Sequence, residues 1–292
     1  MKKVFISGAT GFIGRNLVDY LYSKGYDITV NIRSDNNGFF KKNIKTYRLN
    51  TNEIIKDITY FKGCKFDGII HLAANYLKIH QPSDLPKMVQ SNILLGTHLL
   101  ECAVISGVTW FINTGSFFQN KNKSNYSPVN LYSSLKESYE QIAKYYYENN
   151  NIKFCTIKLS DTYGLNDSRN KLINLLINSL ETNELVSINA SPDQPLNLLH
   201  IDDVVNAFYL LIQEIEKNNV NNGDVYSLKA KSPISIFELI SLIEKLSKSK
   251  LNIKWPENRR EIFIAEPPNI KNINNWSSKV ELSEGIKSLL NK

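Results

Sequence analysis

Short apolar runs rich in β-branched residues alternate with longer amphipathic stretches through the first half of the chain. The apolar runs predict strands at Lys3–Ser7, Asp27–Arg33, Thr46–Asn50, Gly68–Ala73, Trp110–Thr114 and Phe154–Leu159. The amphipathic stretches predict helices near Gly11–Lys24, Asn52–Phe61, Val89–Ser106 and Leu131–Asn149. Because nearly continuous apolar strands separated by helices are typical of a parallel sheet covered on both faces, we predict a doubly wound α/β fold of the Rossmann type.

The alternation becomes less regular after Asp161. Helices are predicted at Lys171–Leu180, Ile201–Ile215 and Ile236–Leu246, and strands at Leu185–Ile188 and Val225–Leu228. Asp202 or Asp203 is expected to cap the second of these helices. We therefore predict a Rossmann domain of residues 1–165, to which 200–218 return, and a smaller C-terminal α/β substrate lobe of 166–199 and 219–292.

A glycine-rich turn, Gly8-Ala9-Thr10-Gly11-Phe12-Ile13-Gly14, joins the first predicted strand to the first predicted helix. Such a turn is tight, and its lack of bulky side chains lets the backbone approach a pyrophosphate closely. The helix that follows presents unpaired N–H groups and a partial positive charge to the phosphates. In an alternating α/β chain this spacing predicts a dinucleotide site, the alternative being a tight turn without a ligand. The cofactor contacts expected here are Gly8, Thr10, Gly11, Phe12, Ile13 and Gly14.

The end of the second predicted strand indicates which cofactor is used. A carboxylate there would bind the ribose hydroxyls of NAD, whereas a cation suits the 2′-phosphate of NADP. The chain reads Asn31-Ile32-Arg33-Ser34 at this point, and its first carboxylate, Asp35, comes later. We expect NADPH rather than NADH, with Arg33 and Ser34 at the phosphate. The alternative is that Arg33 is an ordinary exposed arginine.

Tyr132 and Lys136 lie four residues apart at the start of a predicted helix. This spacing places both side chains on one helix face. A free phenol, with a pKa of about 10, is a poor acid–base group at neutral pH. A nearby ammonium and a nicotinamide ring are expected to favour the phenolate and lower that pKa. Downstream of a dinucleotide turn, the pair predicts proton transfer by Tyr132 to a carbonyl that receives hydride.

Composition and charge argue against several other classes of protein. The chain has 292 residues, 42% hydrophobic and 22% charged, as is typical of globular proteins. Its net charge of +7 comes from dispersed lysines rather than a basic patch, so no nucleic-acid partner is expected. No uninterrupted apolar run reaches membrane-spanning length, so no membrane association is expected. Cys64, Cys102 and Cys155 lack metal-ligand spacing, so neither a metal site nor a disulfide is expected.

Several motifs together resemble an established enzyme family. Besides the glycine turn and the Tyr132/Lys136 pair, the matching segments are His71–Ala74, Tyr163–Gly164, Leu199–Val204 and Trp276–Gly285. Over nearly its whole length the chain is similar to the extended short-chain dehydrogenases/reductases that act as nucleotide-sugar epimerases, dehydratases and reductases. The resemblance implies a nucleotide-sugar substrate, a cytoplasmic location, and a homodimer formed through the helices near 89–106 and 131–149.

The resemblance also implies roles for individual residues. Thr114 is expected to orient the substrate carbonyl through its hydroxyl, with Ser116 as the fallback. Lys136 is expected to hold the nicotinamide ribose as well as to tune Tyr132. Further cofactor contacts are expected at Asn50, Leu72, Ala73, Ala74, Asn92 and Leu159. Substrate contacts are expected at Asn75, Tyr76, Thr114, Ser116 and Arg260.

Departures from the family's dehydratases indicate the type of reaction. Those enzymes carry an Asp-Glu pair directly after the Ser/Thr, and here the two positions are Gly115 and Ser116. Neither titrates usefully, so dehydration is not expected. The tail from Trp255 to Glu261 and the Thr114-Gly115-Ser116 sequence resemble the family's reductases that make 6-deoxyhexoses. This resemblance implies NADPH-dependent reduction of the C4 ketone of a nucleotide-linked 4-keto-6-deoxyhexose, for surface polysaccharides such as O-antigen lipopolysaccharide. The first expected substrate is dTDP-4-keto-6-deoxyglucose, giving a product such as dTDP-fucose. The second is a CDP-4-keto-3,6-dideoxyhexose, giving CDP-abequose.

Two other functions stay open. A 4-epimerase of the same family would keep NAD tightly bound and return the hydride to its substrate. A non-catalytic, NADP-sensing regulator could use the same fold, although such proteins typically lose the Tyr–Lys pair that is present here.

Overall fold

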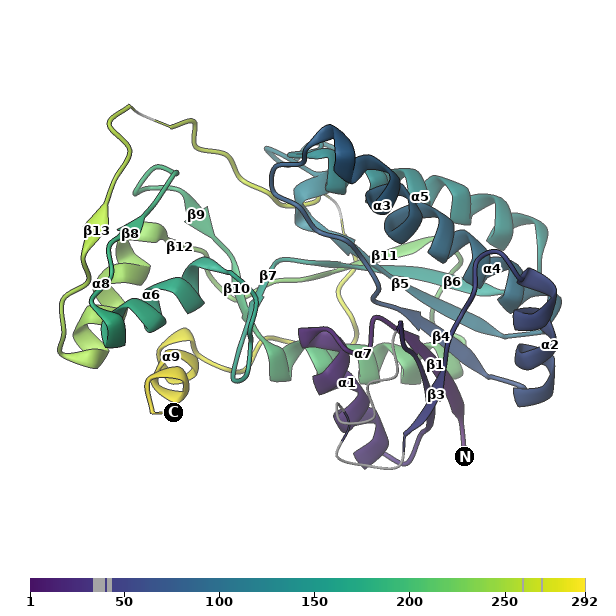
Figure 1. Ribbon diagram of the computed structural model, residues 1–292. Coiled ribbons are helices and arrows are strands. Elements are labelled where there is room, and N and C mark those ends of the chain that lie inside the picture. The colour runs from purple at the N-terminus through teal and green to yellow at the C-terminus, as the bar shows by residue number, and fades with distance from the viewer. Residues whose placement is uncertain (34–39, 41–43, 259, 269, 292) are drawn as a thin grey trace.

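The computed structural model describes residues 1–33, 40, 44–258, 260–268 and 270–291. Ser34, which the sequence predicts at the cofactor, lies outside the described residues. The molecule has a larger lobe built around a seven-stranded sheet and a smaller lobe of helices and short strand pairs (Figure 1).

The seven strands of the larger lobe are all parallel. They are β1 (Lys3–Ser7), β2 (Asp27–Asn31), β3 (Lys45–Tyr47), β4 (Gly68–His71), β5 (Trp110–Ser116), β6 (Lys153–Leu159) and β11 (Asp224–Leu228). Their spatial order is β11-β6-β5-β4-β1-β2-β3. The order reverses between β1 and β4, and in open sheets of this kind ligands bind beyond the carboxyl ends of the strands at such a reversal.

Helices cover both faces of this sheet, which confirms the predicted doubly wound fold (Figure 1). On one face, α1 (Phe12–Ser23) and α7 (Ile201–Glu216) form one core with strand residues. On the other face, α2 (Ile54–Cys64), α4 (Leu95–Ile105) and α5 (Leu131–Asn149) form a second core. A short helix, α3 (Leu85–Val89), and a π-helical turn at Gln90–Leu94 lead into α4.

The helical segment Pro82–Ile105, which includes α4, is long and apolar enough by length and composition to cross a membrane. Leu99, Leu100 and Ala103 of this segment are fully buried in the core shared with α2 and α5. Packing inside the larger lobe therefore accounts for the apolar composition of the segment.

The start of α7 differs from the expectation that Asp202 or Asp203 would cap it. The N-cap residue is His200, whose Nδ1 accepts a hydrogen bond from the Asp202 N–H at 3.3 Å. Asp203 is buried and instead accepts the N–H groups of Lys279 and Val280 at 3.0 and 3.1 Å. Its carboxylate therefore attaches the C-terminal segment to α7, a contact between residues more than 70 positions apart that local capping rules do not anticipate.

The smaller lobe has its own apolar core, contributed by α6 (Leu172–Thr182), α8 (Ile236–Ser247) and α9 (Leu282–Leu290). Three short strand pairs complete it. They are β7 (Asp161–Tyr163) with β10 (Leu198–His200), β9 (Pro195–Leu196) with β12 (Ile234–Ser235), and β8 (Val186–Ser187) with β13 (Ile253–Lys254). Residues 219–292 do not all lie here, because β11 extends the large sheet beside β6 and Ile273 belongs to the core of the larger lobe.

After β13 the chain crosses between the two lobes (Figure 1). The Phe263 carbonyl accepts the side-chain amide of Gln194 at 2.6 Å, on the smaller-lobe side. The Ile264 N–H donates to Asn122 Oδ1 at 3.1 Å, on the larger-lobe side. The crossing segment is therefore attached to both lobes.

Candidate active site

The glycine turn lies tightly against the end of β4. Gly8 has φ +73°, a conformation that favours glycine, and a Cβ there would lie 2.5 Å from the Ala73 nitrogen. A Cβ at Gly14 would lie 2.3 Å from the Gly8 carbonyl oxygen. The sequence therefore requires glycine at both positions for packing, and Leu72 and Ala73 lie directly against the turn.

Helix α1 begins at this turn with an exposed glycine, Gly11, at its N-cap. Glycine has no side chain with which to cap the first N–H groups of the helix, so these remain available to an anion. A dinucleotide pyrophosphate fits this cradle, since backbone donors and a helix dipole are combined at a point with no side chain in the way. Phe12 and Gly14 are buried, whereas Thr10 and Ile13 are partly exposed beside them.

Arg33 lies two residues after the end of β2 and is exposed, as a residue that contacts a 2′-phosphate would be. Asn31, at the end of β2, accepts the Leu49 N–H at 3.1 Å through its side-chain oxygen. Asn50 uses its side chain to accept the Asn52 N–H at 3.1 Å, while its own N–H donates to Asp57 at 3.0 Å. Asn31 and Asn50 thus shape the loop after β3, and the cofactor contact expected of Asn50 stays a prediction.

The His71–Ala74 segment after β4 is held by buried hydrogen bonds. His71 Nδ1 lies 2.7 Å from Ser7 Oγ at the end of β1. Burial, and secondarily the charge of Lys136, lower the pKa of His71 to about 3, so its ring is neutral at neutral pH. The Asn92 side chain bonds both the N–H and the carbonyl of Asn75 at 3.1 Å. Asn92 therefore positions the segment after β4 rather than facing solvent.

Tyr132 lies in the first turn of α5, whose N-cap, Asn130, accepts the Ser133 N–H at 3.0 Å. The Tyr132 ring meets the Tyr76 ring edge-on, with centroids 5.1 Å apart. Burial, and secondarily Tyr76, raise the pKa of Tyr132 above its ordinary value. The expected lowering by Lys136 is therefore not found, because desolvation of the phenol dominates. Tyr132 is protonated at neutral pH and suited to donate a proton.

Lys136 is 2% exposed and lies one turn further along α5. Its Nζ is 5.9 Å from the centroid of the Tyr132 ring. Within the described part of the chain, this ammonium has no hydrogen-bond partner, so it can bind the hydroxyls of a ligand ribose. Burial lowers the pKa of Lys136 to about 8, and the charge of Glu140 opposes that shift.

Two hydroxyl residues of β5 differ in what they can donate. Thr114 is buried, and its hydroxyl donates to the His71 carbonyl at 2.9 Å. Strand β5 runs two residues beyond its predicted end, so that Ser116 stands at its carboxyl end beside Leu159 of β6. Ser116 Oγ accepts the Phe118 N–H at 3.2 Å, and its hydroxyl hydrogen has no acceptor among the described residues.

The structure also places a cation near Tyr132 that sequence reasoning missed. Lys171 Nζ is 5.2 Å from the centroid of Tyr76, the ring that contacts Tyr132, and 2.8 Å from Asp161 Oδ1. Only its position before an apolar helix marks Lys171 in the sequence, and that does not reveal the contact with Tyr76. Arg260, the cation expected at the substrate, is exposed on the crossing segment and has no ion-pair partner among the described residues.

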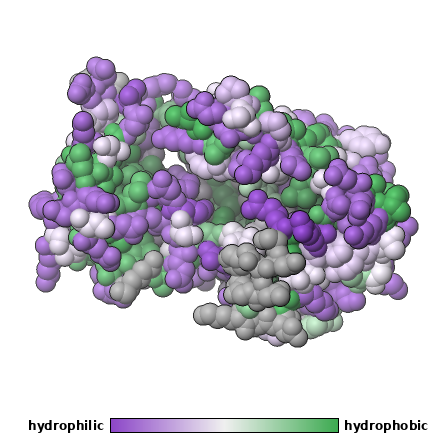
Figure 2. Space-filling view, viewed as in Figure 1, coloured by the Kyte–Doolittle hydropathy of each residue, from purple (hydrophilic) through white to green (hydrophobic). Residues whose placement is uncertain are grey.

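A hollow lies between the two lobes (Figure 2). Hydrophobic residues form its floor and hydrophilic residues surround it. A mixed surface of this kind suits a ligand with both apolar rings and charged groups.

Comparisons with known proteins agree with this arrangement. Residues 4–227 match the model of the NAD dependent epimerase/dehydratase family. CDP-abequose synthase of Salmonella typhimurium is 26% identical over 99% of this chain and 97% of that protein. The same enzyme of Yersinia pseudotuberculosis is 25% identical over 99% and 100%. A dTDP-D-glucose 4,6-dehydratase of Dictyostelium discoideum is 29% identical over 76% and 58%.

Solved structures show the same fold. UDP-glucose 4-epimerase of Thermotoga maritima, solved with UDP-glucose, has a TM-score of 0.83 at 18% identity, covering 99% of this chain and 97% of that one. UDP-glucuronic acid 4-epimerase of Bacillus cereus, solved with UDP-glucuronic acid and NAD, has a TM-score of 0.80 at 21% identity, covering 99% and 98%. With its dinucleotide turn, its Tyr132–Lys136 pair and a family match over most of its length, the chain belongs to the NAD dependent epimerase/dehydratase family of nucleotide-sugar enzymes.

Proposed function

We propose that this protein uses NADPH to reduce the C4 ketone of a nucleotide-linked 4-keto-6-deoxyhexose. The observation that carries the proposal is the juxtaposition of a protonated phenol, Tyr132, with the ammonium of Lys136, which has no hydrogen-bond partner among the described residues. Strand β4 links this pair to the cofactor turn, since Ala73 lies against Gly8 and His71 lies within the field of Lys136.

The side chains have complementary roles in this reduction. A bound nicotinamide cofactor would supply the hydride that C4 accepts. Tyr132 donates its phenolic proton to the C4 oxygen, so the ketone becomes an alcohol and the phenol becomes a phenolate. The Lys136 ammonium stabilises that phenolate by its charge and binds the nicotinamide ribose. Its Nζ needs such a partner, because a buried ammonium without hydrogen bonds is costly.

Ser116 is the better candidate for the hydroxyl that orients the ketone. A ketone oxygen only accepts hydrogen bonds, and Ser116 has a hydroxyl hydrogen to donate, whereas the Thr114 hydrogen is engaged by the His71 carbonyl. We expect Ser116→Ala to lower kcat about tenfold or more and Thr114→Val to have the smaller effect on kcat. The opposite order would return this role to Thr114, the first expectation from the sequence.

The nucleotide is best assigned as CDP. The sequence alone placed a dTDP sugar first, but CDP-abequose synthases match the chain from end to end. We therefore put a CDP-4-keto-3,6-dideoxyhexose ahead of dTDP-4-keto-6-deoxyglucose. Lys171 and Arg260 are the cations that we assign to the substrate diphosphate.

The first test is to incubate the purified protein with each of the two sugars and NADPH or NADH. Loss of NADPH absorbance with the CDP sugar would support the whole proposal, and loss with the dTDP sugar only would restore the original order. Loss of NADH in preference to NADPH would overturn the assignment of Arg33. Failure to oxidise either cofactor, in a protein that releases NAD on denaturation, would indicate a 4-epimerase instead.

We also propose a homodimer formed through α4 and α5. Ile105 of α4, Tyr145 of α5 and Leu94 of the preceding turn are large apolar residues left exposed in the single chain. Light scattering of the wild type and of Tyr145→Glu would test this. A monomeric mass for the wild type would contradict it.

A further inference from the structure

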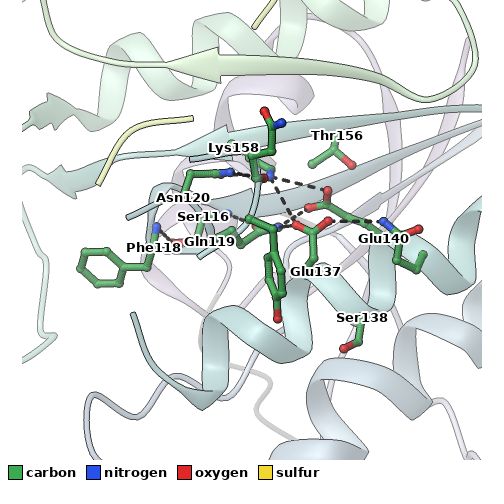
Figure 3. A network of polar contacts seen from close by, with 12 residues as sticks. Ser116, Phe118, Gln119, Asn120, Glu137, Ser138, Glu140, Thr156 and Lys158 are labelled. Carbon is green, nitrogen blue, oxygen red and sulfur yellow. Dashed lines mark hydrogen bonds and ion pairs between the residues drawn. The ribbon is translucent and has the colours of Figure 1, made fainter. Parts of the chain in front are cut away.

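A cluster of largely buried polar and charged side chains was not anticipated from the sequence (Figure 3). One of its members, Glu140, acts electrostatically on Lys136. The cluster comprises Gln119, after β5, Glu137 and Glu140 on α5, and Lys158 on β6. The Lys158 side chain is 7% exposed and that of Glu140 is 12% exposed. Buried charges are costly unless they are paired, so their arrangement requires an explanation.

Gln119 holds both carboxylates in place. Its side-chain oxygen accepts the Ser116 N–H at 2.7 Å. Its side-chain nitrogen donates to Glu137 Oε2 at 2.7 Å and to Glu140 Oε1 at 3.0 Å. Because every polar group of the amide is used, its orientation is determined, and the carboxylates are tied to the strand end that carries Ser116 (Figure 3).

Lys158 supplies the positive charge of the cluster. Its Nζ donates to Asn120 Oδ1 at 3.1 Å and lies 3.6 Å from Glu137 Oε2 and 3.8 Å from Glu140 Oε2. Two carboxylates therefore share one close ammonium. Lys136, on the same helix as the two carboxylates, provides a second positive charge. When both carboxylates are ionised, the four charges sum to zero.

The cluster packs directly against Gly115, the residue between Thr114 and Ser116. A Cβ at Gly115 would lie 2.8 Å from Gln119 Oε1, 2.9 Å from Glu140 Oε1 and 2.9 Å from Lys158 Cγ. Gly115 is therefore glycine because the side chains of the cluster fill the space that its own would need. An aspartate at this position would require these side chains to shift.

Glu140 follows Lys136 by four residues on α5, so the two side chains lie on one helix face. Burial raises the pKa of Glu140 to about 7, opposed by Lys158, Gln119 and Lys136. Glu137 adds to the rise, and Tyr147 also lies within the field of Glu140.

The groups that face Lys136 are Glu140, the Tyr132 ring and His71 of β4, which is neutral at neutral pH. Glu140 is the charged group that opposes the loss of the Lys136 proton. Its effect on Lys136 is therefore electrostatic and depends on the cluster keeping Glu140 ionised.

We propose that Glu140 is a positioning residue, held by Gln119 and Lys158 one helical turn from Lys136, where its charge opposes the loss of the Lys136 proton. The inference rests on the proposed roles of Tyr132 and Lys136. Through Lys136, Glu140 controls how well the Tyr132 phenolate is stabilised, without touching substrate or cofactor itself.

Glu140→Gln tests the proposal, because glutamine keeps an acceptor for Gln119 and removes the charge. The protein is labelled with ¹³C at the lysine ε-carbon, and the Lys136 signal is assigned through Lys136→Met. We expect the Lys136 titration midpoint to fall by about one pH unit in Glu140→Gln, the size typical of losing a nearby opposite charge. The alkaline limb of kcat/KM should move down by the same amount, with little change in sugar KM.

Glu137→Gln is the matched control, since Glu137 shares Gln119 and Lys158 but is not among the charges that act on Lys136. It should leave the Lys136 midpoint unchanged or raise it, because removing Glu137 makes Glu140 easier to ionise. Lys158→Met is a second test, in which the cation close to Glu140 is removed. It should lower the Lys136 midpoint, because Glu140 without its cation becomes protonated.

An unchanged Lys136 midpoint in folded Glu140→Gln would overturn the proposal, and thermal unfolding shows whether the variant is folded. Should Glu140→Gln not fold, an unchanged midpoint in Lys158→Met would overturn it equally. The titration needs no substrate. A shifted midpoint in a protein that reduces no keto sugar would therefore uphold the role of Glu140 and reject the ketoreductase, so the two failures are distinguishable.

Discussion

Two clusters of buried charged and polar groups lie on the same face of the large sheet, and they differ in how fully their hydrogen bonds are satisfied. Between α2 and α4, the fully buried Asp57 accepts three hydrogen bonds. The donors are the Tyr47 hydroxyl at 2.7 Å, the Asn50 N–H at 3.0 Å and His98 Nε2 at 2.7 Å. Each comes from a different segment, so the carboxylate joins α2, α4 and the end of β3.

Around α5, by contrast, the charges are incompletely paired. Glu140 accepts one amide hydrogen bond and otherwise meets Lys158 at 3.8 Å. Lys136 has no hydrogen-bond partner within the described residues, and burial lowers its pKa to about 8. A fully satisfied buried group stabilises a fold, whereas a group left short of partners is available to a ligand and titrates near neutral pH. We therefore assign Asp57 to stability and Lys136 to chemistry.

The largest effect should come from Tyr132→Phe. Removing the phenolic proton donor should lower kcat by about 10²–10⁴-fold, the usual contribution of general acid catalysis. The free energy of unfolding should change little, because the ring and its contact with Tyr76 remain. Steady-state turnover together with calorimetric NADPH binding checks this. Retained turnover would remove Tyr132 from the proposed mechanism.

Asp57→Ala should act in the opposite way to Tyr132→Phe, by lowering stability rather than by acting on the catalytic groups. It leaves the three donors around this buried site without an acceptor, so the free energy of unfolding should fall by about 3–5 kcal/mol. The Lys136 titration midpoint should stay at its wild-type value in the protein that remains folded. Urea unfolding measures the first quantity and lysine NMR the second. A shift of the Lys136 midpoint would show that the two clusters are coupled.

The buried His71 extends the comparison to acidic pH. The folded-state pKa of His71 is about 3, well below its unfolded value of about 6.5, so between these values only the unfolded chain takes up the proton. Stability should therefore fall as pH drops from about 6.5 towards 3, by up to about 1.4 kcal/mol per pH unit from this residue. His71→Asn should reduce that slope. If urea unfolding gave His71→Asn and the wild type the same slope of stability against pH between pH 6.5 and 4.5, His71 would be charged in the folded protein.

Arg33→Ala should give the smallest effect, and it tests whether the cofactor reaches the carboxyl end of β2. Losing one charged contact to a 2′-phosphate should raise KM for NADPH about tenfold and leave KM for NADH unchanged. Arg48→Ala, a change at an exposed arginine directly after β3, is a suitable control. Equal KM values for NADPH in Arg33→Ala and the wild type would leave Arg33 as an ordinary surface residue.

Much of the larger lobe was predictable because its signals are local. Strand β1, the glycine turn and α5 were placed within a residue or two of their bounds, since apolar periodicity and helix caps act over a few positions. The predicted cap of α7 was wrong, because Asp203 accepts hydrogen bonds from the backbone of Lys279 and Val280 rather than from its own helix end. The end of β5 was placed two residues early, which hid the difference between Thr114 and Ser116.

The sequence by itself determined the alternating fold, the cofactor turn and the Tyr132–Lys136 pair, because each depends on the spacing of neighbouring residues. The tertiary structure alone decided the state of those groups. Burial raises the pKa of Tyr132 and lowers that of Lys136. The charge of Glu140 opposes the lowering at Lys136, and the ion pair with Lys158 of β6 helps to hold Glu140 in place. Desolvation and pairing depend on what surrounds a group in space, and residues distant in the chain supply those surroundings.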